Sequence, residues 1–270
     1  MSSGSRPVES SSAGEKQPTP PPPAPLLRVS LEAPPTTMRA LEVARVTLRP
    51  GARYDGPWGF GSRVVSVETG AVTVAPVGTD GAGVPPPMSL AGGEHVVLPP
   101  SGGSVAVQTG PAPAVFLDIA VVQSSHVSSP AVPLEPPPQD GVTVEVIADE
   151  LWVVIPAGPI VLTVGRVTLG PGERLGWVPG AGPALLYVEA GTLDVTATGP
   201  VMWMVAPDGE GTTTGPAVTL AAHDSALFAA GDAAGVSSGP SLPATFLVVT
   251  LLPDDGRPPL DGDMPAAPAS

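Results

Sequence analysis

Few residues of this chain are equipped for chemistry. It has three histidines and no cysteine, so thiolate nucleophiles, thiolate metal ligands and disulfides are excluded. His95 and His223 each stand beside an acid, in "GGEHVVLPP" and "AAHDSALF". An acid can orient a histidine as a general base, but His223 and Asp224 are sequence neighbours, which point to opposite faces of a strand. We therefore interpret both histidines as exposed turn residues that precede strands, and His126 as a solvated linker residue.

Nucleophile and phosphate-binding motifs give no further candidates. The serines stand mainly in low-complexity runs, and we identify no nucleophile elbow among them. The Gly-rich stretches "GTDGAG" (78–83) and "GEGTTTG" (209–215) lack the strand-to-helix context of a phosphate loop. We expect these two stretches to be hairpin tips.

The elements that must position the polar residues are short strands. The chain has 39 Pro and 33 Gly among many Val, Ala and Leu, and only 4% of its residues are aromatic. β-Branched runs separated by turn residues are typical of strands, so we expect no long helix. The longest apolar run, "LWVVIPAGPIVLTVG" (151–165), contains Pro and Gly and is shorter than the roughly 20 residues of a spanning helix. We interpret this run as paired strands and expect no membrane segment.

Two stretches of the chain are near-copies of each other. Residues 41–74 align without a gap on 162–195, with identity at fifteen of 34 positions. A second match, "PAVFLDIAVV" (113–122) on "PATFLVVTLL" (243–252), lies at a separation of 130 instead of 121. Repetition of this length indicates an internal duplication. The later copy therefore has nine extra residues, which we place near 199–216.

Composition divides the chain into two foldable units and three other segments. The other segments are rich in Pro and Ser and cannot bury enough apolar surface to fold alone, so we predict that they are disordered. "PTPPPPAP" (18–25) is either a plain spacer or a polyproline ligand. The predicted division is a tail (1–25), a first unit (26–122), a linker (123–141), a second unit (142–252) and an acidic, Pro-rich tail (253–270).

Within each unit, period-two apolar runs flank short turn motifs. "ETG" (68–70) and "EAG" (189–191) stand between such runs, and we predict hairpins there, with Gly70 and Gly191 supplying the positive φ of a short turn. Seven to nine short strands per unit without helical periodicity predict an antiparallel sandwich or barrel. The predicted fold class is all-β, with two tandem antiparallel β-sandwich or barrel units related by a pseudo-twofold axis.

The spacing of residues in both units resembles the cupin superfamily, and specifically its two-domain members, the bicupins. The first cupin motif runs Gly, five residues, His-X-His, three or four residues, Glu, six residues, Gly. This frame occurs twice, with other residue types at every ligand position: Gly51, Pro57, Gly59, Arg63 and Gly70 in the first unit, and Gly172, Val178, Gly180, Ala184 and Gly191 in the second.

A looser trace of the second cupin motif follows in each unit. It places Ser104 and Ala234 where the family has its fourth metal ligand. The trace consists of Gly93, Pro99, Ser101, Ser104 and Gln108 in the first unit, and of Ala229, Gly231, Ala234 and Ser238 in the second.

The resemblance implies jelly-roll barrels that hold an ion such as Mn, Fe or Ni in the family's enzymes. Such an ion needs three or four lone-pair donors that converge at about 2.0–2.2 Å. Pro, Gly, Val and Ala offer none, and Arg63 places a permanent cation where the family has a carboxylate. We therefore expect no metal and no cofactor in either unit. The family's metal-independent epimerases imply a His base and a Tyr acid, but Tyr54 and Tyr187 have no evident histidine partner in the frame.

Arg63 is the most suggestive polar residue. If its side chain points into the first unit, it can clamp the carboxylate or phosphate of a small anion, with Ser104 and Gln108 adding hydrogen bonds. The alternative is that Arg63 lies at the mouth of the barrel or pairs with a neighbouring acid. The second unit has Ala184 and Ala234 at the equivalent places, so we expect its interior to be apolar, small or filled.

Two further features of the copies concern structure and association. Arg45 with Glu68, and Arg166 with Glu189, occupy equivalent positions. We expect each to form a cross-strand pair, which contributes about 0.2–1 kcal/mol when exposed. "VMWMV" (201–205) is a candidate exposed apolar patch for self-association. Any homodimer is expected to form through β-strand edges.

The charge of the chain restricts its partners. The formal net charge is −14, which repels phosphate backbones and anionic membrane surfaces, so we expect neither nucleic-acid nor membrane binding. Residues 36–122 carry a net charge of −1 and residues 140–252 a net charge of −9, so the second unit has the more negative surface. No secretion signal is recognised at the N-terminus, and the cytoplasm is the default location.

The functional interpretation follows from the missing donors. We predict a bicupin-like chain without metal sites that acts as a non-catalytic binding or structural module. Two alternatives stay open. One is a sensor or carrier of a small anion or a carbohydrate that uses the first unit, and the other is an enzyme with a site outside the motif frame.

Overall fold

The computed structural model describes residues 25–31, 38–56, 61–78, 86–98, 102–123, 139–154, 158–177, 182–204, 212–232 and 234–254. Most of the predicted tails and of the predicted linker lies outside these residues, although Pro25 begins β1 and Pro253 ends β18. In the described part of the chain, no helix is long and apolar enough to cross a membrane.

Each half of the described chain contributes nine strands. The first half has β1 (Pro25–Leu31), β2 (Met38–Leu48), β3 (Arg53–Asp55), β4 (Gly61–Thr69), β5 (Ala71–Gly78), β6 (Met88–Ala91), β7 (His95–Leu98), β8 (Gly102–Gln108) and β9 (Ala114–Gln123). The second half has β10 (Val142–Val154), β11 (Ile160–Leu169), β12 (Arg174–Trp177), β13 (Ala184–Ala190), β14 (Thr192–Met204), β15 (Thr212–Ala221), β16 (Ser225–Phe228), β17 (Ala234–Ser238) and β18 (Ala244–Pro253).

The strand order of one half repeats in the other. The first half is built on a five-stranded sheet, β10-β2-β9-β4-β7, and a four-stranded sheet, β3-β8-β5-β6. The second half has the corresponding orders β1-β11-β18-β13-β16 and β12-β17-β14-β15, joined because β14 also pairs with β16. All of these pairings are antiparallel. The predicted fold class, all-β with two antiparallel sandwich-type units, is confirmed.

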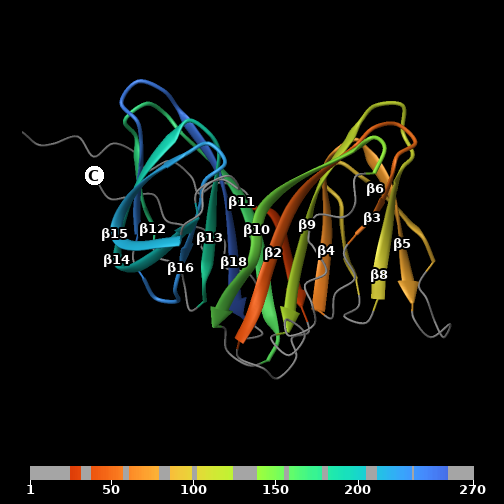
Figure 1. Cartoon of the computed structure of the whole chain (residues 1–270), viewed down its shortest axis with the longest axis horizontal. Coiled ribbons are helices and arrows are strands. Elements are labelled where there is room, and N and C mark those ends of the chain that lie inside the picture. Colours follow the sequence, from red (N-terminus) through yellow and green to blue (C-terminus); the bar gives the residue numbers. More distant parts are fainter. Residues whose placement is uncertain are drawn as a thin grey trace, which may run out of the picture.

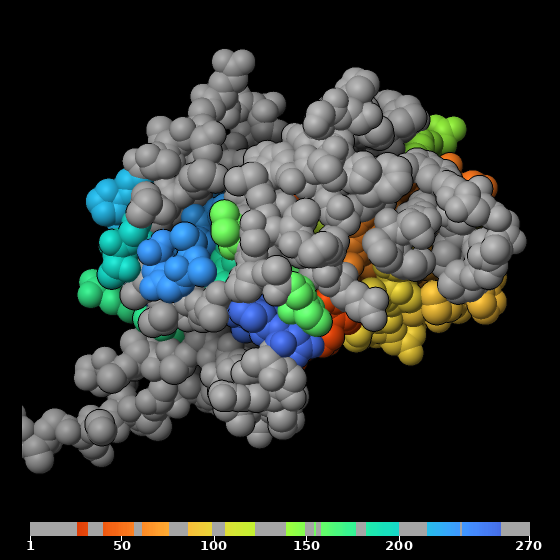
Figure 2. Space-filling view, turned by 90° about the horizontal axis from the view of Figure 1, so that it is seen from below, coloured from red at the N-terminus to blue at the C-terminus, as the bar shows by residue number. Residues whose placement is uncertain are grey.

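The two halves exchange their first strands. β1 pairs with β11, for example Val29 with Leu162, and β10 pairs with β2, for example Val144 with Val46. Figure 1 shows the green β10 beside the orange β2, and Figure 2 shows the red atoms of β1 beside the blue end of β18. Each half therefore supplies one strand to a sheet of the other half. These two strands belong by sequence to the predicted units 26–122 and 142–252, but each pairs within the other unit.

The hairpins predicted at 68–70 and 189–191 are wrong. β4 pairs with β7 and β9, whereas β5 pairs with β6 and β8, so at Gly70 the chain crosses from one sheet to the other. The predicted positive φ is confirmed, at 78° for Gly70 and 81° for Gly191. A Cβ on Gly70 would lie 2.7 Å from the Pro113 carbonyl oxygen, so this crossing needs glycine for close approach as well as for φ.

The nine extra residues of the second half lie in one hairpin. β14 and β15 together span residues 192–221, thirty positions, whereas β5 and β6 span 71–91, twenty-one positions. The longer β14 pairs Met202 with Leu227 and Met204 with Ser225 on β16. The insertion therefore closes the second half into one continuous sheet.

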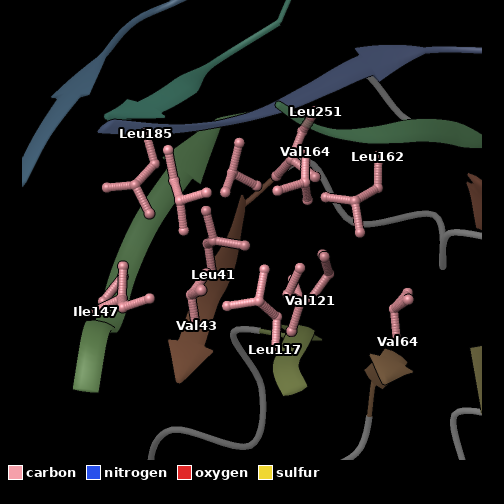
Figure 3. Close-up of a cluster of buried hydrophobic side chains, with 14 of the residues drawn as sticks. Leu41, Val43, Val64, Leu117, Val121, Ile147, Leu162, Val164, Leu185 and Leu251 are labelled. Carbon is pink, nitrogen blue, oxygen red and sulfur yellow. The ribbon is translucent and has the colours of Figure 1, made fainter. Parts of the chain in front are cut away.

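Three apolar cores hold these sheets together. One fills the interior of each half, and the third lies between the halves. Neighbouring residues of β4 face different cores, Val64 the one between the halves and Val65 the one inside the first half. Figure 3 shows side chains such as Leu41 and Leu117 opposite Leu162 and Leu185. Strands buried on both faces give continuous apolar runs, which explains stretches such as "ALLYV".

Gly191 and Gly172 provide a matched test of the sheet crossing. Both have positive φ, but a Cβ on Gly191 would lie 2.4 Å from the Pro243 carbonyl oxygen, whereas no atom lies within 4 Å of a Cβ on Gly172. We expect Gly172→Ala to lower the free energy of unfolding by about 1–2 kcal/mol, from the left-handed backbone alone. Gly191→Ala should cost on the order of 3 kcal/mol or more. Equal losses in urea unfolding would contradict this account.

Candidate functional site

The interior of the first half contains a buried polar cluster, which consists of Arg63, Asp118 and Tyr54. Arg63 on β4 lies on the same face as Val65 and thus points into the first unit, where the motif frame has its Glu. Asp118 comes from β9, and Tyr54 from β3. Arg63 is 6% exposed, Asp118 5% and Tyr54 2%. Three strands of two different sheets therefore direct polar groups to one point of the core.

The geometry of the cluster is a closed ion pair. Arg63 Nε donates to Asp118 Oδ1 at 2.5 Å, and Arg63 Nη2 donates to Asp118 Oδ2. Tyr54 Oη donates to Asp118 Oδ2 at 3.2 Å. A Cβ on Gly56 would lie 2.0 Å from Arg63 Nη2, so the backbone at Gly56 packs directly on the guanidinium. The fork of two hydrogen bonds satisfies both charges inside the protein.

Burial and charge determine the protonation of this cluster. Burial lowers the pKa of Arg63, but the charge and hydrogen bonds of Asp118 outweigh burial and raise that pKa, so the guanidinium stays charged. Burial raises the pKa of Tyr54, and the negative charge of Asp118 raises it further. The cluster is therefore an ion pair with a neutral phenol. The sequence leaves two interpretations open for Arg63, an anion clamp on one side and a mouth position or a pair with a neighbouring acid on the other. The structure shows Arg63 paired with an acid, Asp118.

The two other residues of the predicted anion site lie elsewhere. Gln108 on β8 accepts from the Gly51 amide at 3.2 Å and donates to the Ala112 carbonyl at 2.5 Å. These contacts tie two turns together, and neither involves Arg63. The Ser104 side chain lies outside the described residues, although its backbone pairs with Pro76. The contacts described for Gln108 therefore do not bring it to Arg63, and anion binding stays a prediction.

The second unit has apolar residues where the first has the polar cluster. Ala184, Val248 and Leu175 occupy the positions equivalent to Arg63, Asp118 and Tyr54. All three belong to the apolar core of the second half. Ala234, at the frame's fourth ligand position, is part of the same core. At these positions the interior of the second unit is apolar, as expected.

The described residues contain no group of three or more His, Cys, Asp or Glu side chains that could hold a metal ion. Four positions of the first motif, Pro57, Gly59, Val178 and Gly180, and two of the second, Pro99 and Ser101, lie outside that part of the chain.

A second polar cluster joins the two halves, and its centre is a ring of two arginines and two glutamates. Arg45 Nε donates to Glu68 Oε2 at 2.9 Å, and Arg166 Nε donates to Glu189 Oε2 at 2.6 Å. Both pairs predicted from the duplicated sequence are confirmed. Arg166 also donates to Glu68 at 2.5 Å, and Arg45 to Glu189. Each arginine therefore contacts one glutamate of its own half and one of the other.

On one side the ring continues into a Glu–Tyr–His group. Glu145 on the exchanged strand β10 lies 3.3 Å from Arg45 Nη1. Tyr187 Oη donates to Glu145 Oε1, and His223 Nδ1 lies 2.8 Å from the same oxygen and 2.9 Å from Tyr187 Oη. The motif frame gives Tyr187 no evident histidine partner, but the structure pairs it with His223, which stands where the frame of the first unit has Gly93. The sequence neighbour Asp224 instead accepts from the Ala221 amide at 2.8 Å.

One sequence signal points to this group. His223 occupies the position that is Gly93 in the first half, at a separation of 130. Its φ is 75°, and Gly93 has 87°. A non-glycine residue in the left-handed region is uncommon, costs free energy and is often found where a side chain has a specific role. Alignment of the copies at this turn would have identified His223.

Protonation in the Glu–Tyr–His group follows from its donors. Partial burial raises the pKa of Glu145, but the hydrogen bond from Tyr187 and the charge of Arg45 outweigh burial and lower it. Glu145 is therefore ionised and accepts only. Because Tyr187 Oη donates its hydrogen bond to Glu145 and Glu145 only accepts, His223 Nδ1 is the donor to Glu145, and a neutral ring keeps its free lone pair on Nε2. The side chain of His223 is 59% exposed, so the group presents an oriented imidazole to solvent.

One segment of the second half has the residue spacing of a serine nucleophile motif. "GVSSG" (235–239) has Gly-X-Ser-X-Gly spacing. Its serines lie on β17, which pairs with β12 and β14, and not at a strand-to-helix turn. The Ser238 hydroxyl donates to the Gly170 carbonyl, the same kind of turn contact that Gln108 makes at the equivalent place. The motif therefore does not form a nucleophile elbow.

Comparisons with known proteins identify similar solved structures. No protein-family model matches the sequence. No curated protein matches it either. A structure of Bacillus subtilis oxalate decarboxylase at pH 4.6 is 15% identical and has a TM-score of 0.47, over 78% of this chain and 68% of that chain. A structure of the same enzyme from work on its Mn(II) centres is 14% identical, over 83% of this chain and 76% of that chain, also with a TM-score of 0.47.

Alkaline titration tests the protonation of both clusters at once. The chain has only two tyrosines, and burial raises the pKa of each, assisted by Asp118 for Tyr54 and by Glu145 for Tyr187. A raised folded pKa stabilises the fold below the unfolded pKa of about 10, and this stability is lost as pH rises further. We expect tyrosinate absorbance at about 295 nm to remain absent near pH 10 and to rise only with loss of the β circular dichroism signal. Titration of either phenol in the folded protein near pH 10 would contradict this.

Substitutions of Asp118 and Arg63 test the closed ion pair. Asp118→Leu leaves the buried guanidinium uncompensated, so the free energy of unfolding should fall by about 3–5 kcal/mol. The double variant Arg63→Met/Asp118→Leu removes both charges and should recover most of that loss, since an apolar replacement of a buried pair is often neutral. The Tyr54 hydroxyl loses its acceptor in both variants, so their difference isolates the charge. A double variant no more stable in urea than Asp118→Leu would disprove the pairing.

Proposed function

We propose that this chain is a non-catalytic, two-domain cupin-like protein that acts as a binding or structural module and has no metal site in either unit. One observation carries the proposal. At the ligand positions of the repeated frame, the described side chains leave no donors for a metal. In the first half Arg63 pairs with Asp118, and in the second half Ala184 and Ala234 belong to the apolar core.

The ion pair argues against metal binding at this point of the first unit. A divalent cation beside Arg63 would face a permanent positive charge, and the carboxylate that contacts Arg63, Asp118, is already held by both ends of the guanidinium fork. Separating that buried pair leaves charges without partners, which costs several kcal/mol. The binding energy of an ion would have to exceed this cost.

The same argument weakens the small-anion alternative. A carboxylate or phosphate on Arg63 would have to displace Asp118, and would then leave that aspartate buried and unpaired. The alternative of an enzyme has one specific observation in its favour, the oriented imidazole of His223, because a carboxylate that fixes the ring is the arrangement of a general base. No nucleophile or acid beyond Glu145 and Tyr187 contacts His223 among the described residues.

Metal content and ligand-dependent stability together test the proposed function. The full chain is purified from cells grown with added manganese, iron, cobalt, nickel and zinc, and is measured by mass spectrometry for metals. We expect far less than one transition ion per chain, and no rise in melting temperature with carboxylates, phosphates or sugars. A ligand at about 100 times its Kd would add about 2.7 kcal/mol, so binding would be visible.

The outcomes separate the alternatives. A transition ion near one per chain overturns the proposal in favour of an enzyme. A rise in melting temperature with an anion, present in the native chain and absent from Arg63→Met/Asp118→Leu, overturns it in favour of an anion carrier. The double variant is used as the control because it lacks Arg63 and is expected to be stable. The single variant Asp118→Leu is not used because it is expected to be destabilised.

A further inference from the structure

The outer edge of β7 (His95–Leu98) differs from that of its counterpart in the second half. β16 (Ser225–Phe228) is paired on both sides, with β13 and with the extended end of β14. β7 pairs with β4 and ends the order of its sheet. In the described ranges no strand occupies the place beside β7 that β14 occupies beside β16.

The burial of the two strands reflects this difference. All four residues of β16 are buried, whereas those of β7 alternate between exposed and buried. Val97 is 40% exposed, and the equivalent Leu227 is 8% exposed. A strand at the edge of a sheet presents backbone N–H and C=O groups with which another strand can pair.

The segments that lie outside the described ranges are poorly suited to pair with that edge. The nine-residue insertion that lengthens β14 has no counterpart in the β5–β6 hairpin. The segment that joins β5 to β6 includes "TDGAGVP" (79–85), whose Gly, Asp and Pro are depleted in strands. The terminal segments and the linker are rich in Pro, which has no N–H to donate to a sheet.

We propose that the outer edge of β7 binds an extended apolar segment of a partner protein as an added antiparallel strand. The register is the one that β14 takes on β16, where Met202, Trp203 and Met204 face Leu227, Ala226 and Ser225. On β7 the corresponding residues are Val97, Val96 and His95. Main-chain hydrogen bonds supply the affinity and alternate side chains the selectivity.

The chemistry of the partner follows from this in-chain precedent. The segment has at least three consecutive residues that can pair, contains large apolar side chains such as Met and Trp, and lacks Pro within the paired stretch. The inference gives the proposed binding role a class of partner, and it rests on that role.

A peptide with the sequence of residues 199–205, GPVMWMV, is the probe. It is labelled with a fluorophore and titrated with the full chain, and its fluorescence anisotropy is followed. We expect saturable binding in the micromolar range. The same peptide with N-methyl groups on alternate backbone nitrogens should bind at least about tenfold more weakly, because it cannot donate to the edge.

Two matched variants of the protein locate the site. Val97→Lys adds a charge of the kind that protects natural edge strands, and should weaken peptide binding by about tenfold or more. Val154→Lys changes a valine of β10 that is 65% exposed, and should leave binding unchanged. If Val97→Lys does not fold, hydrogen exchange on the native chain replaces it, and the peptide should slow exchange of the β7 amides.

Several results would overturn the inference. They are peptide binding that does not saturate, equal binding of the N-methylated peptide, peptide binding that Val97→Lys leaves unchanged, and exchange of the β7 amides that the peptide leaves unchanged. Binding that survives Val97→Lys would mean that the peptide displaces β14 from β16. A concentration-dependent dimer that Val97→Lys abolishes would assign the edge to a second copy of this chain. Metal content is measured separately, so a failed peptide experiment leaves the proposed function standing, and a bound metal leaves the edge result standing.

Discussion

The arrangement of the two halves depends on a ring of four charges between them. Arg45 and Arg166 each contact both Glu68 and Glu189. The ring has no net charge, and its glutamates are largely buried, so shifting one half against the other would break the two Arg–Glu contacts that cross between the halves. The apolar core beside it supplies most of the stabilisation, because burial there is extensive and undirected. The ring adds specificity to the position of one half against the other, since its hydrogen bonds between the halves form only in one relative position.

The ring is symmetric between the two halves, whereas the polar group beside the ring and the interiors of the halves are not. Tyr187, Glu145 and His223 form a hydrogen-bonded group on one side, whereas the equivalents of Tyr187 and His223 are Ser66 and Gly93. The interiors differ in the same way, because the apolar core of the first half encloses the Arg63–Asp118 pair, whereas the equivalent positions of the second half, Ala184 and Val248, are apolar. Backbone pairing tolerates these changes, because strands are held by main-chain hydrogen bonds whatever side chain lies between them.

Sequence reasoning succeeded where the signal was local or repeated. The repeated sequence identified the Arg–Glu pairs and the glycines of positive φ, because each occurs twice at one separation. It failed where distant strands decide. A tight turn at Gly70 has the same local chemistry whether the flanking strands pair or enter different sheets, so the hairpin prediction was wrong. Asp118, 55 residues from Arg63, and Glu145, 78 residues from His223, carry no local mark of their partners.

The nine-residue insertion shows how one length change alters a whole edge. It extends β14 far enough to cover β16, and so removes an unpaired edge from the second half. The first half keeps the shorter hairpin, and β7 ends its sheet in the part of the chain that the structure describes. An unpaired edge is a hazard for aggregation, which proteins limit with short strands and nearby charge. β7 has only four residues and follows Glu94, so its edge is too short to template long sheets and long enough to pair with one selected segment.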